Sequence, residues 1–246
     1  MKPLEHHLRE QLELPDGYFW HATRWRAVRR FLPAGPITVL DVGAGGGWLG
    51  HRLAEERPDV SYTFVEPLST LSTVLEEEFG PAANARTGSP ITAQAVTMLD
   101  VMEHQSDDIG FLSDYVRRSV AGTTFVLTVP ASMRLWSAWD VELGHFRRYT
   151  ARSLRATMRS AGLEITEVSY LFPELWPAAA ARRLAAPAKA ADPGSGRPEF
   201  RALPRPVNGV LRGVGAGTVA VRRLVPFGTS VLGVGRTPVS ETDTDL

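Results

Sequence analysis

The chain has 246 residues, of which 43% are hydrophobic and 22% are charged, so its composition is that of an ordinary globular protein with room for one large domain and an elaboration. Its net charge is zero and it has no cysteine, which excludes disulfides, thiolate metal sites and a cysteine nucleophile, and is compatible with the cytoplasmic location that we expect. No run reaches the roughly 20 apolar residues that span a bilayer, and the charged residues 1–14 lack the apolar segment of a signal peptide.

Two helical stretches are predicted near the start of the chain, separated by the turn signal Pro15-Asp16-Gly17. From residue 37 onward, short apolar runs alternate with amphipathic stretches, which predicts a mostly parallel sheet with helices on both faces. The predicted strands are 37–42, 62–65, 95–99, 123–129, 164–171 and 229–234. The predicted helices between them are 48–56, 71–79, 109–120 and 153–161.

Residues 172–227 differ from the rest of the chain because they are rich in proline and carry most of a basic excess. We interpret this segment as a helical insertion before the last strand, with helices at 178–186 and 207–224; residues 228–246 form the last strand and an acidic tail. Three roles stay open for this segment: it could rest on an anionic membrane, form an apolar binding pocket or form a dimer interface. Nucleic acid is disfavoured, because basic and aromatic residues do not interleave here. The arginines concerned are Arg182, Arg183, Arg212, Arg222 and Arg223.

A glycine loop follows the first predicted strand, with the spacing D-x-G-x-G-x-G from Asp41 through Gly43 and Gly45 to Gly47. Glycines let the backbone turn tightly and approach a ligand closely at the start of a helix. The dinucleotide pattern G-x-G-x-x-G fits only from Gly45 to Gly50, two residues beyond the strand end where its first glycine belongs. A carboxylate ahead of the glycines suits a cationic amine better than a pyrophosphate.

A second acid, Glu66, ends the second predicted strand 19 residues after Gly47. A carboxylate at this position of a nucleotide-binding α/β fold can accept hydrogen bonds from both ribose hydroxyls of an adenosine. The alternative is that Glu66 only caps the helix that the chain enters through Pro67.

Over roughly residues 17–171 the chain resembles the class I methyltransferases that use S-adenosyl-L-methionine (SAM). The segment from Met98 to His104 is similar to the family's fourth-strand motif in its D-V-x-E-H variety, which is common in small-molecule and quinone-type enzymes. The resemblance implies a Rossmann-like, seven-stranded, mostly parallel sheet spanning 36–171 and the last strand. The family's acid near the adenine has no counterpart in 86–90, which leaves that contact to Ser89 or a backbone carbonyl. The implied cofactor residues are Asp41, Gly43, Ala44, Gly45, Gly47, Glu66, Pro67, Asp100 and Val101.

Residues 129–150 carry a second pattern, which resembles the V-P-A…W-S-x-x-D…G-H-x-R-R-Y-T motif of a bacterial branch of this family. His145 is a candidate base for the acceptor, and Asp140 would orient it. His104, after the fourth strand, competes for the same role. The alternative is that the polar side chains only order the loop before an N-cap at Thr150. The substrate-binding candidates of this motif are Trp136, Arg147, Arg148 and Tyr149, of which the two arginines could clamp a carboxylate or phosphate.

The aromatic start of the chain, with Trp20, Arg24 and Trp25, resembles the family's lid helix, so we assign residues 1–35 to a helical lid. Trp20 is a substrate-side candidate that would shield the sulfonium of SAM, and the alternative is that it docks the helix on the sheet.

Together these patterns predict a SAM-dependent methyltransferase acting on a small-molecule or lipid-like acceptor, with no metal and no nucleic-acid partner. Two alternatives stay open. One is a SAM-binding enzyme of the same fold that catalyses a non-methylating reaction such as cyclisation or decarboxylation, and the other is an NAD(P)-dependent oxidoreductase.

Overall fold

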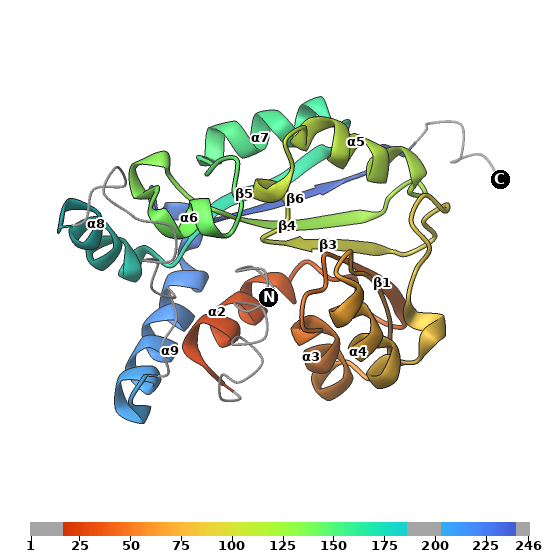
Figure 1. Ribbon diagram of the computed structural model, residues 1–246, viewed down its shortest axis with the longest axis horizontal. Helices are drawn as coiled ribbons and strands as arrows, with labels where there is room; N and C mark the ends of the chain where they lie inside the picture. Colours follow the sequence, from red (N-terminus) through yellow and green to blue (C-terminus); the bar gives the residue numbers. More distant parts are fainter. Residues whose placement is uncertain (1–16, 186–202, 240–246) are drawn as a thin grey trace.

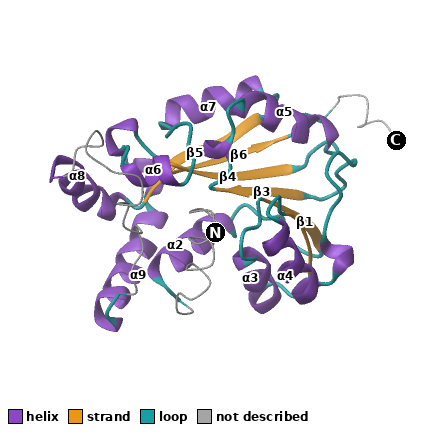
Figure 2. Cartoon of the chain, in the orientation of Figure 1, coloured by secondary structure: helices purple, strands orange, loops and turns teal. Residues whose placement is uncertain are grey.

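A sheet of six strands in the order β2-β1-β3-β4-β6-β5 forms the centre of the protein (Figures 1 and 2). The computed structural model describes residues 17–185 and 203–239. Strands β1 to β4 are parallel, and β6 runs antiparallel to both of its neighbours, β4 and β5. The sheet is therefore mostly parallel, as predicted. The strands are β1 (Ile37–Val42), β2 (Val60–Val65), β3 (Ala95–Leu99), β4 (Thr124–Pro130), β5 (Glu164–Leu171) and β6 (Ser230–Arg236).

The prediction of a seventh strand is wrong for the described residues, whose sheet has six strands. Beside β2, where the family would place it, the chain makes one isolated parallel bridge between Phe64 and Asn84. The amide of Ala85 donates to the carbonyl of Phe64 at 2.8 Å. The following residues, 86–90, include Gly88 at a positive φ of 84° and Pro90, and neither residue extends a ladder.

Helices cover both faces of the sheet. In Figure 1, α5 and α7 lie on one face, and α2, α3 and α4 lie on the other. Strand β4 is buried at every residue from Thr124 to Val129, because a central strand between two helical layers has no solvent face. The helices are α2 (Phe19–Val28), α3 (Trp48–Glu56), α4 (Ser69–Phe79), α5 (Asp108–Arg118), α6 (Ala138–Glu142), α7 (Ala151–Ser160), α8 (Trp176–Ala185) and α9 (Arg205–Ala220).

Helix α9, from the predicted insertion, packs against α2 near the start of the chain (Figure 1). Gly215 faces Thr23 so closely that a Cβ on the glycine would overlap the threonine side chain, which explains a glycine inside a helix. Asn208 accepts a hydrogen bond from the amide of Phe19 at 2.7 Å and donates one to the carbonyl of Gly17 at 3.1 Å. Helix α2 is thus capped by a side chain 189 residues away.

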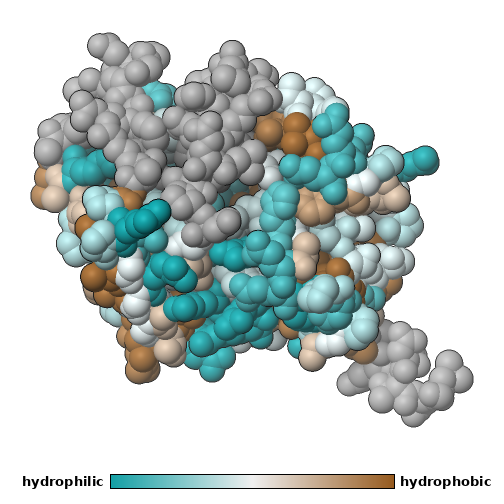
Figure 3. Space-filling model, turned by 90° about the horizontal axis from the view of Figure 1, so that it is seen from below, coloured by the Kyte–Doolittle hydropathy of each residue, from teal (hydrophilic) through white to brown (hydrophobic). Residues whose placement is uncertain are grey.

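Part of the basic excess in this segment is neutralised inside the protein. Glu167 on β5 is buried and accepts from Arg222 at 2.5 and 2.9 Å and from Arg223 at 2.8 Å. Arg222 is itself 7% exposed, so it is not a surface cation as the sequence pattern suggested. Hydrophilic residues cover much of the face seen in Figure 3, with hydrophobic residues scattered among them. Among the described residues, none of the helices is both long and apolar enough to cross a membrane.

Candidate active site

The glycine loop after β1 has the geometry that its spacing predicts. Gly43, Gly45 and Gly47 all have positive φ, and Gly47 lies directly before the first turn of α3. The amide of Gly43 donates to the carbonyl of Val65 at 2.7 Å, which ties the loop to the end of β2. A Cβ on Gly43 would lie 2.7 Å from Cγ2 of Val101, so this position needs glycine for space as well as for conformation.

Asp41 lies at the end of β1 and is 4% exposed. Its Oδ1 accepts from the hydroxyl of Thr97 at 2.7 Å, and its Oδ2 accepts from the hydroxyl of Tyr62 at 3.1 Å. Burial outweighs these hydrogen bonds and raises the pKa of Asp41 to about 6. A buried carboxylate in this state favours a cationic partner, which is what the ammonium group of a methionine moiety provides.

Glu66 uses both oxygens to order the loops beside the glycines. Its Oε2 accepts from the amide of Gly45 at 2.7 Å, and its Oε1 accepts from the amide of Leu68 at 2.8 Å. Burial raises the pKa of Glu66 above its usual value. Each carboxylate oxygen has a second acceptor site, so the backbone contacts leave capacity for ribose hydroxyls. The two predicted roles, ribose binding and ordering of the turn, are compatible.

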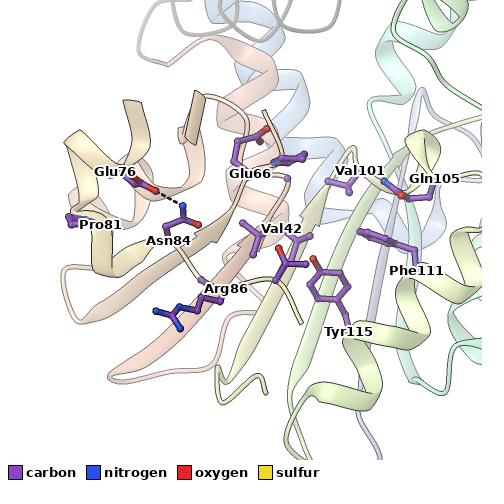
Figure 4. A pocket seen from close by; sticks show the side chains of 15 residues that line it. Val42, Glu66, Glu76, Pro81, Asn84, Arg86, Val101, Gln105, Phe111 and Tyr115 are labelled. Carbon is purple, nitrogen blue, oxygen red and sulfur yellow. Dashed lines mark hydrogen bonds between the residues drawn. The ribbon is translucent and has the colours of Figure 1, made fainter. Parts of the chain in front are cut away.

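A cavity of about 610 Å³ opens beside Glu66 (Figure 4). Arg86 and Thr87 contribute to its wall, whereas Ser89 does not. All three residues belong to the segment 86–90, which lacks the family's acid near the adenine. The opposite wall in Figure 4 comes from Phe111 and Tyr115 of α5, whose i,i+4 spacing places them on one helix face. These two aromatic residues were not predicted as site residues, although their i,i+4 spacing within the predicted helix 109–120 was a signal for them. The lining residues are Val42, Gly43, Val65, Glu66, Pro67, Glu76, Pro81, Asn84, Ala85, Arg86, Thr87, Val101, Gln105, Phe111 and Tyr115.

Asp100 follows β3 with a φ of 60°, a left-handed conformation that is uncommon outside glycine. Its Oδ1 accepts from the hydroxyl of Thr128 at 3.2 Å, and its Oδ2 forms an ion pair with Arg24 of α2. Arg24 is buried, which lowers its pKa to about 9, and it also interacts electrostatically with Asp41 and Glu103. Helix α2 is therefore held over the carboxyl ends of β1 and β3 by one arginine.

Trp20 of the same helix lies in the core. It stacks on Phe172 with ring centroids 6.1 Å apart, and the guanidinium of Arg24 lies 3.6 Å from the centre of its ring. The side chain is 6% exposed. Trp20 thus packs in a buried cluster with strand residues such as Val126 and Leu232, as expected if it docks α2 on the sheet.

The structure joins Asp140, His145 and Arg148 of the second motif. Nδ1 of His145 lies 2.8 Å from Oδ1 of Asp140, and Nε of Arg148 donates to the same oxygen at 2.6 Å. The amide of Ser137 donates to Oδ2 at 2.8 Å. Burial alone would raise the pKa of Asp140, but the hydrogen bonds and charges of His145 and Arg148 outweigh it and lower the pKa to about 2. Asp140 is thus an ionised carboxylate that orients His145.

His104 and Glu103 lie beside this pair, in the short turn after β3. The rings of His104 and His145 meet edge to face with centroids 4.7 Å apart. Glu103 is 1% exposed, and its burial raises its pKa to about 8. The amide of Phe146 donates to the carbonyl of Glu103 at 2.7 Å, so the backbone joins the two motifs. Glu103 was not among the predicted site residues, although it belongs to the D-V-x-E-H motif.

Arg147 and Tyr149 both contact Asp108, the first residue of α5. Arg147 pairs with Oδ1 of Asp108 at 2.5 Å, and the Tyr149 hydroxyl donates to Oδ2 at 2.7 Å. Tyr149 is 2% exposed, and burial together with Asp108 raises its pKa. Trp136, the remaining candidate, is partly buried and follows the turn at Met133–Leu135. Through these contacts Arg147 and Tyr149 order the loop before α7, which was the alternative to substrate binding for these two residues.

A Rossmann-like sheet with one reversed strand, a glycine loop after β1 and acids at the ends of β1 and β2 define an α/β protein that binds an adenosine-containing cofactor. The chain belongs to the methyltransferase domain family, whose family model matches residues 5–168. The predicted membership of a methyltransferase family is confirmed at this level, with SAM as the cofactor.

One curated relative is the ribosomal RNA small subunit methyltransferase G of Salinispora tropica, 34% identical over 110 residues that cover 36% of this chain. This chain spans 45% of the length of that relative. The prediction that the protein has no nucleic-acid partner is contradicted by these relatives, because both are named as methyltransferases of ribosomal RNA.

Solved structures agree on the fold. The complex of the Haloferax volcanii Trm112 methyltransferase activator with a methyltransferase matches with a TM-score of 0.59 at 16% identity, covering 92% of each chain. Phosphoethanolamine N-methyltransferase 2 of Haemonchus contortus with bound SAM matches with a TM-score of 0.55 at 14% identity, covering 91% of this chain and 56% of that one.

Proposed function

We propose that this protein transfers the methyl group of SAM to an oxygen or nitrogen of a small-molecule acceptor beside His104 and His145. The observation that carries the proposal is the Asp140–His145 pair, 2.8 Å apart, placed next to the loop end of β3. Asp41, the glycine loop and Glu66 would hold the cofactor, and the cavity beside Glu66 has room for its adenine. When bound, SAM would supply an electrophilic methyl group. The acceptor oxygen or nitrogen would take up this group and lose a proton, and S-adenosylhomocysteine would be the leaving group.

His145 is proposed to contribute to activation of the acceptor, with Asp140 as its positioning residue. Because the ionised Asp140 accepts a hydrogen bond from Nδ1, the tautomer that it favours carries its lone pair on Nε2, on the opposite side of the ring. Methyl transfer depends mainly on alignment, so we expect His145→Ala to reduce turnover and to leave binding of S-adenosylhomocysteine unchanged. Loss of cofactor binding in this variant would show that His145 is a structural residue only.

The small size of the acceptor is supported by the enclosure of the site. Asp140 is fully buried, Glu103 is 1% exposed, and the His145 side chain is 8% exposed. A second candidate acceptor is ribosomal RNA, which the Salinispora relative favours by its name.

The acceptor experiment uses SAM with a labelled methyl group and two acceptor pools, a filtrate of small metabolites and purified small ribosomal subunits. Label in the metabolite pool with a mass gain of one methyl group supports the proposal. Label only in the RNA supports the second candidate, and a product without a methyl group would indicate a non-methylating reaction. A thermal-shift titration should show stabilisation by S-adenosylhomocysteine and none by NAD.

A further inference from the structure

Three potential metal ligands converge where the two motifs meet. Glu103, His104 and His145 each offer one ligand atom, and these atoms all lie within 4.8 Å of one another. Glu103 and His104 are neighbours in the short 3-10 turn Met102–His104, and His145 reaches them from the loop after α6. No metal site was predicted from the sequence, in which the absence of cysteine excludes thiolate ligands.

Glu103 gives an independent reason to expect a cation here. Its Oε2 atom is buried and has no hydrogen-bond partner. A buried carboxylate oxygen without a partner is costly, and such groups are normally paired or bound to a metal. Two arginines act on Glu103 electrostatically, but each of them contacts another carboxylate, since Arg24 pairs with Asp100 and Arg148 donates to Asp140.

The environment of His145 is also that of a metal-binding histidine. Histidine ligands usually donate their second ring N–H to a carboxylate, a backbone carbonyl or water, which sets the tautomer and the ring orientation. Asp140 takes this role at Nδ1, and Arg148 in turn holds Asp140 in place. With its proton on Nδ1, His145 has a lone pair on Nε2 that can bind a metal ion.

We propose that Glu103, His104 and His145 bind one divalent transition-metal cation of the Zn²⁺ or Mn²⁺ type. Two imidazoles and one carboxylate suit these ions, whereas Mg²⁺ and Ca²⁺ prefer oxygen ligands alone. Tetrahedral coordination at about 2.1 Å needs ligand atoms about 3.4 Å apart, so the side chains close by roughly an ångström on binding.

Three protein ligands leave at least one coordination position open. At this place an open position can take an oxygen or nitrogen of the acceptor and lower its pKa, which would be how His145 contributes to activation. This catalytic use depends on the proposed function. The metal site itself does not.

The binding experiment uses the untagged full-length protein, stripped with EDTA and titrated with Co²⁺ followed by visible absorption, and with Zn²⁺ by calorimetry. We expect one equivalent per chain. Glu103→Gln and His104→Ala should each weaken binding at least tenfold, and Asp140→Asn should weaken it 10- to 100-fold. His51→Ala is the matched control, because His51 forms an exposed pair with Glu78 at 3.1 Å. His6→Ala with His7→Ala removes an adjacent histidine pair that can itself attract metal.

Absence of stoichiometric binding would overturn the site, as would binding that survives Glu103→Gln and His104→Ala or is lost with the His6 and His7 substitutions. Stabilisation by S-adenosylhomocysteine reports whether each variant is folded. If a ligand variant does not fold, X-ray absorption of the Zn²⁺-loaded wild type decides, since the proposal requires two imidazole ligands. Full methyl transfer by the stripped protein would overturn the catalytic use, and the binding data distinguish that result from failure of the site.

Discussion

Replacing Asp41 by asparagine should stabilise the cofactor-free protein at neutral pH and at the same time weaken its cofactor binding. The two effects have one cause, the burial of a carboxylate that lacks its cationic ligand. Asp41 accepts hydrogen bonds from Thr97 and Tyr62, yet burial still raises its pKa to about 6. Asparagine keeps the shape and avoids the buried charge.

The size of the effect follows from the pKa of Asp41. An increase of about two units above the ordinary value corresponds to about 3 kcal/mol in the free energy of unfolding. Since the folded state binds this proton more tightly than the unfolded state does, the penalty is absent below about pH 4, grows as the pH rises toward 6 and is complete above it. The stability of Asp41→Asn relative to wild type should therefore increase by up to about 3 kcal/mol from pH 4 to pH 7.

Urea unfolding at several pH values measures this difference, and calorimetry measures the affinity for S-adenosylhomocysteine. Loss of a charged hydrogen bond of about 1.5–3 kcal/mol should weaken binding tenfold or more. Asp140→Asn is the matched control with the opposite sign. The pKa of Asp140 is lowered to about 2, so its contribution, roughly 2 kcal/mol, is present above pH 4 and lost as the pH falls toward 2.

Two results would refute this reasoning. One is a stability difference for Asp41→Asn that does not change between pH 4 and pH 7, which would mean that the carboxylate carries no burial penalty. The other is an unchanged affinity for S-adenosylhomocysteine, which would mean that Asp41 does not face the charged end of the cofactor.

Gly43→Ala should lower stability by about 1–3 kcal/mol and weaken cofactor binding, because its φ is 68° and the new Cβ would lie 2.7 Å from Val101. Gly35→Ala shares the positive φ but meets nothing within 4 Å, so it should show the conformational cost alone; equal effects in a thermal-shift assay would contradict the role of the clash. Glu167→Gln leaves the buried Arg222 without its counter-charge and should cost about 3 kcal/mol in urea unfolding, whereas a change below 1 kcal/mol would show that the ion pair contributes little.

The sequence alone determined the features that depend on neighbours along the chain. Strands β1, β3 and β5 begin and end at the predicted residues, because runs of apolar and β-branched side chains determine them locally. The glycine loop was predictable because its spacing requires positive φ at Gly43, Gly45 and Gly47. Both acids, Asp41 and Glu66, were predicted from their place at the end of a strand.

Only the tertiary structure decided the features that join distant segments. The seventh strand is reduced to one bridge at Asn84, because the chain there does not stay extended beside β2. Asp108 forms an ion pair with Arg147 and accepts a hydrogen bond from Tyr149, and both partners lie about 40 residues away in the sequence. No local sequence pattern predicts these contacts. Likewise, the proximity of Glu103 to His145 exists because the loops after β3 and β4 meet at one edge of a parallel sheet. Periodicity and backbone conformation are local properties of a sequence, whereas the partners of a buried charge depend on which strands become neighbours.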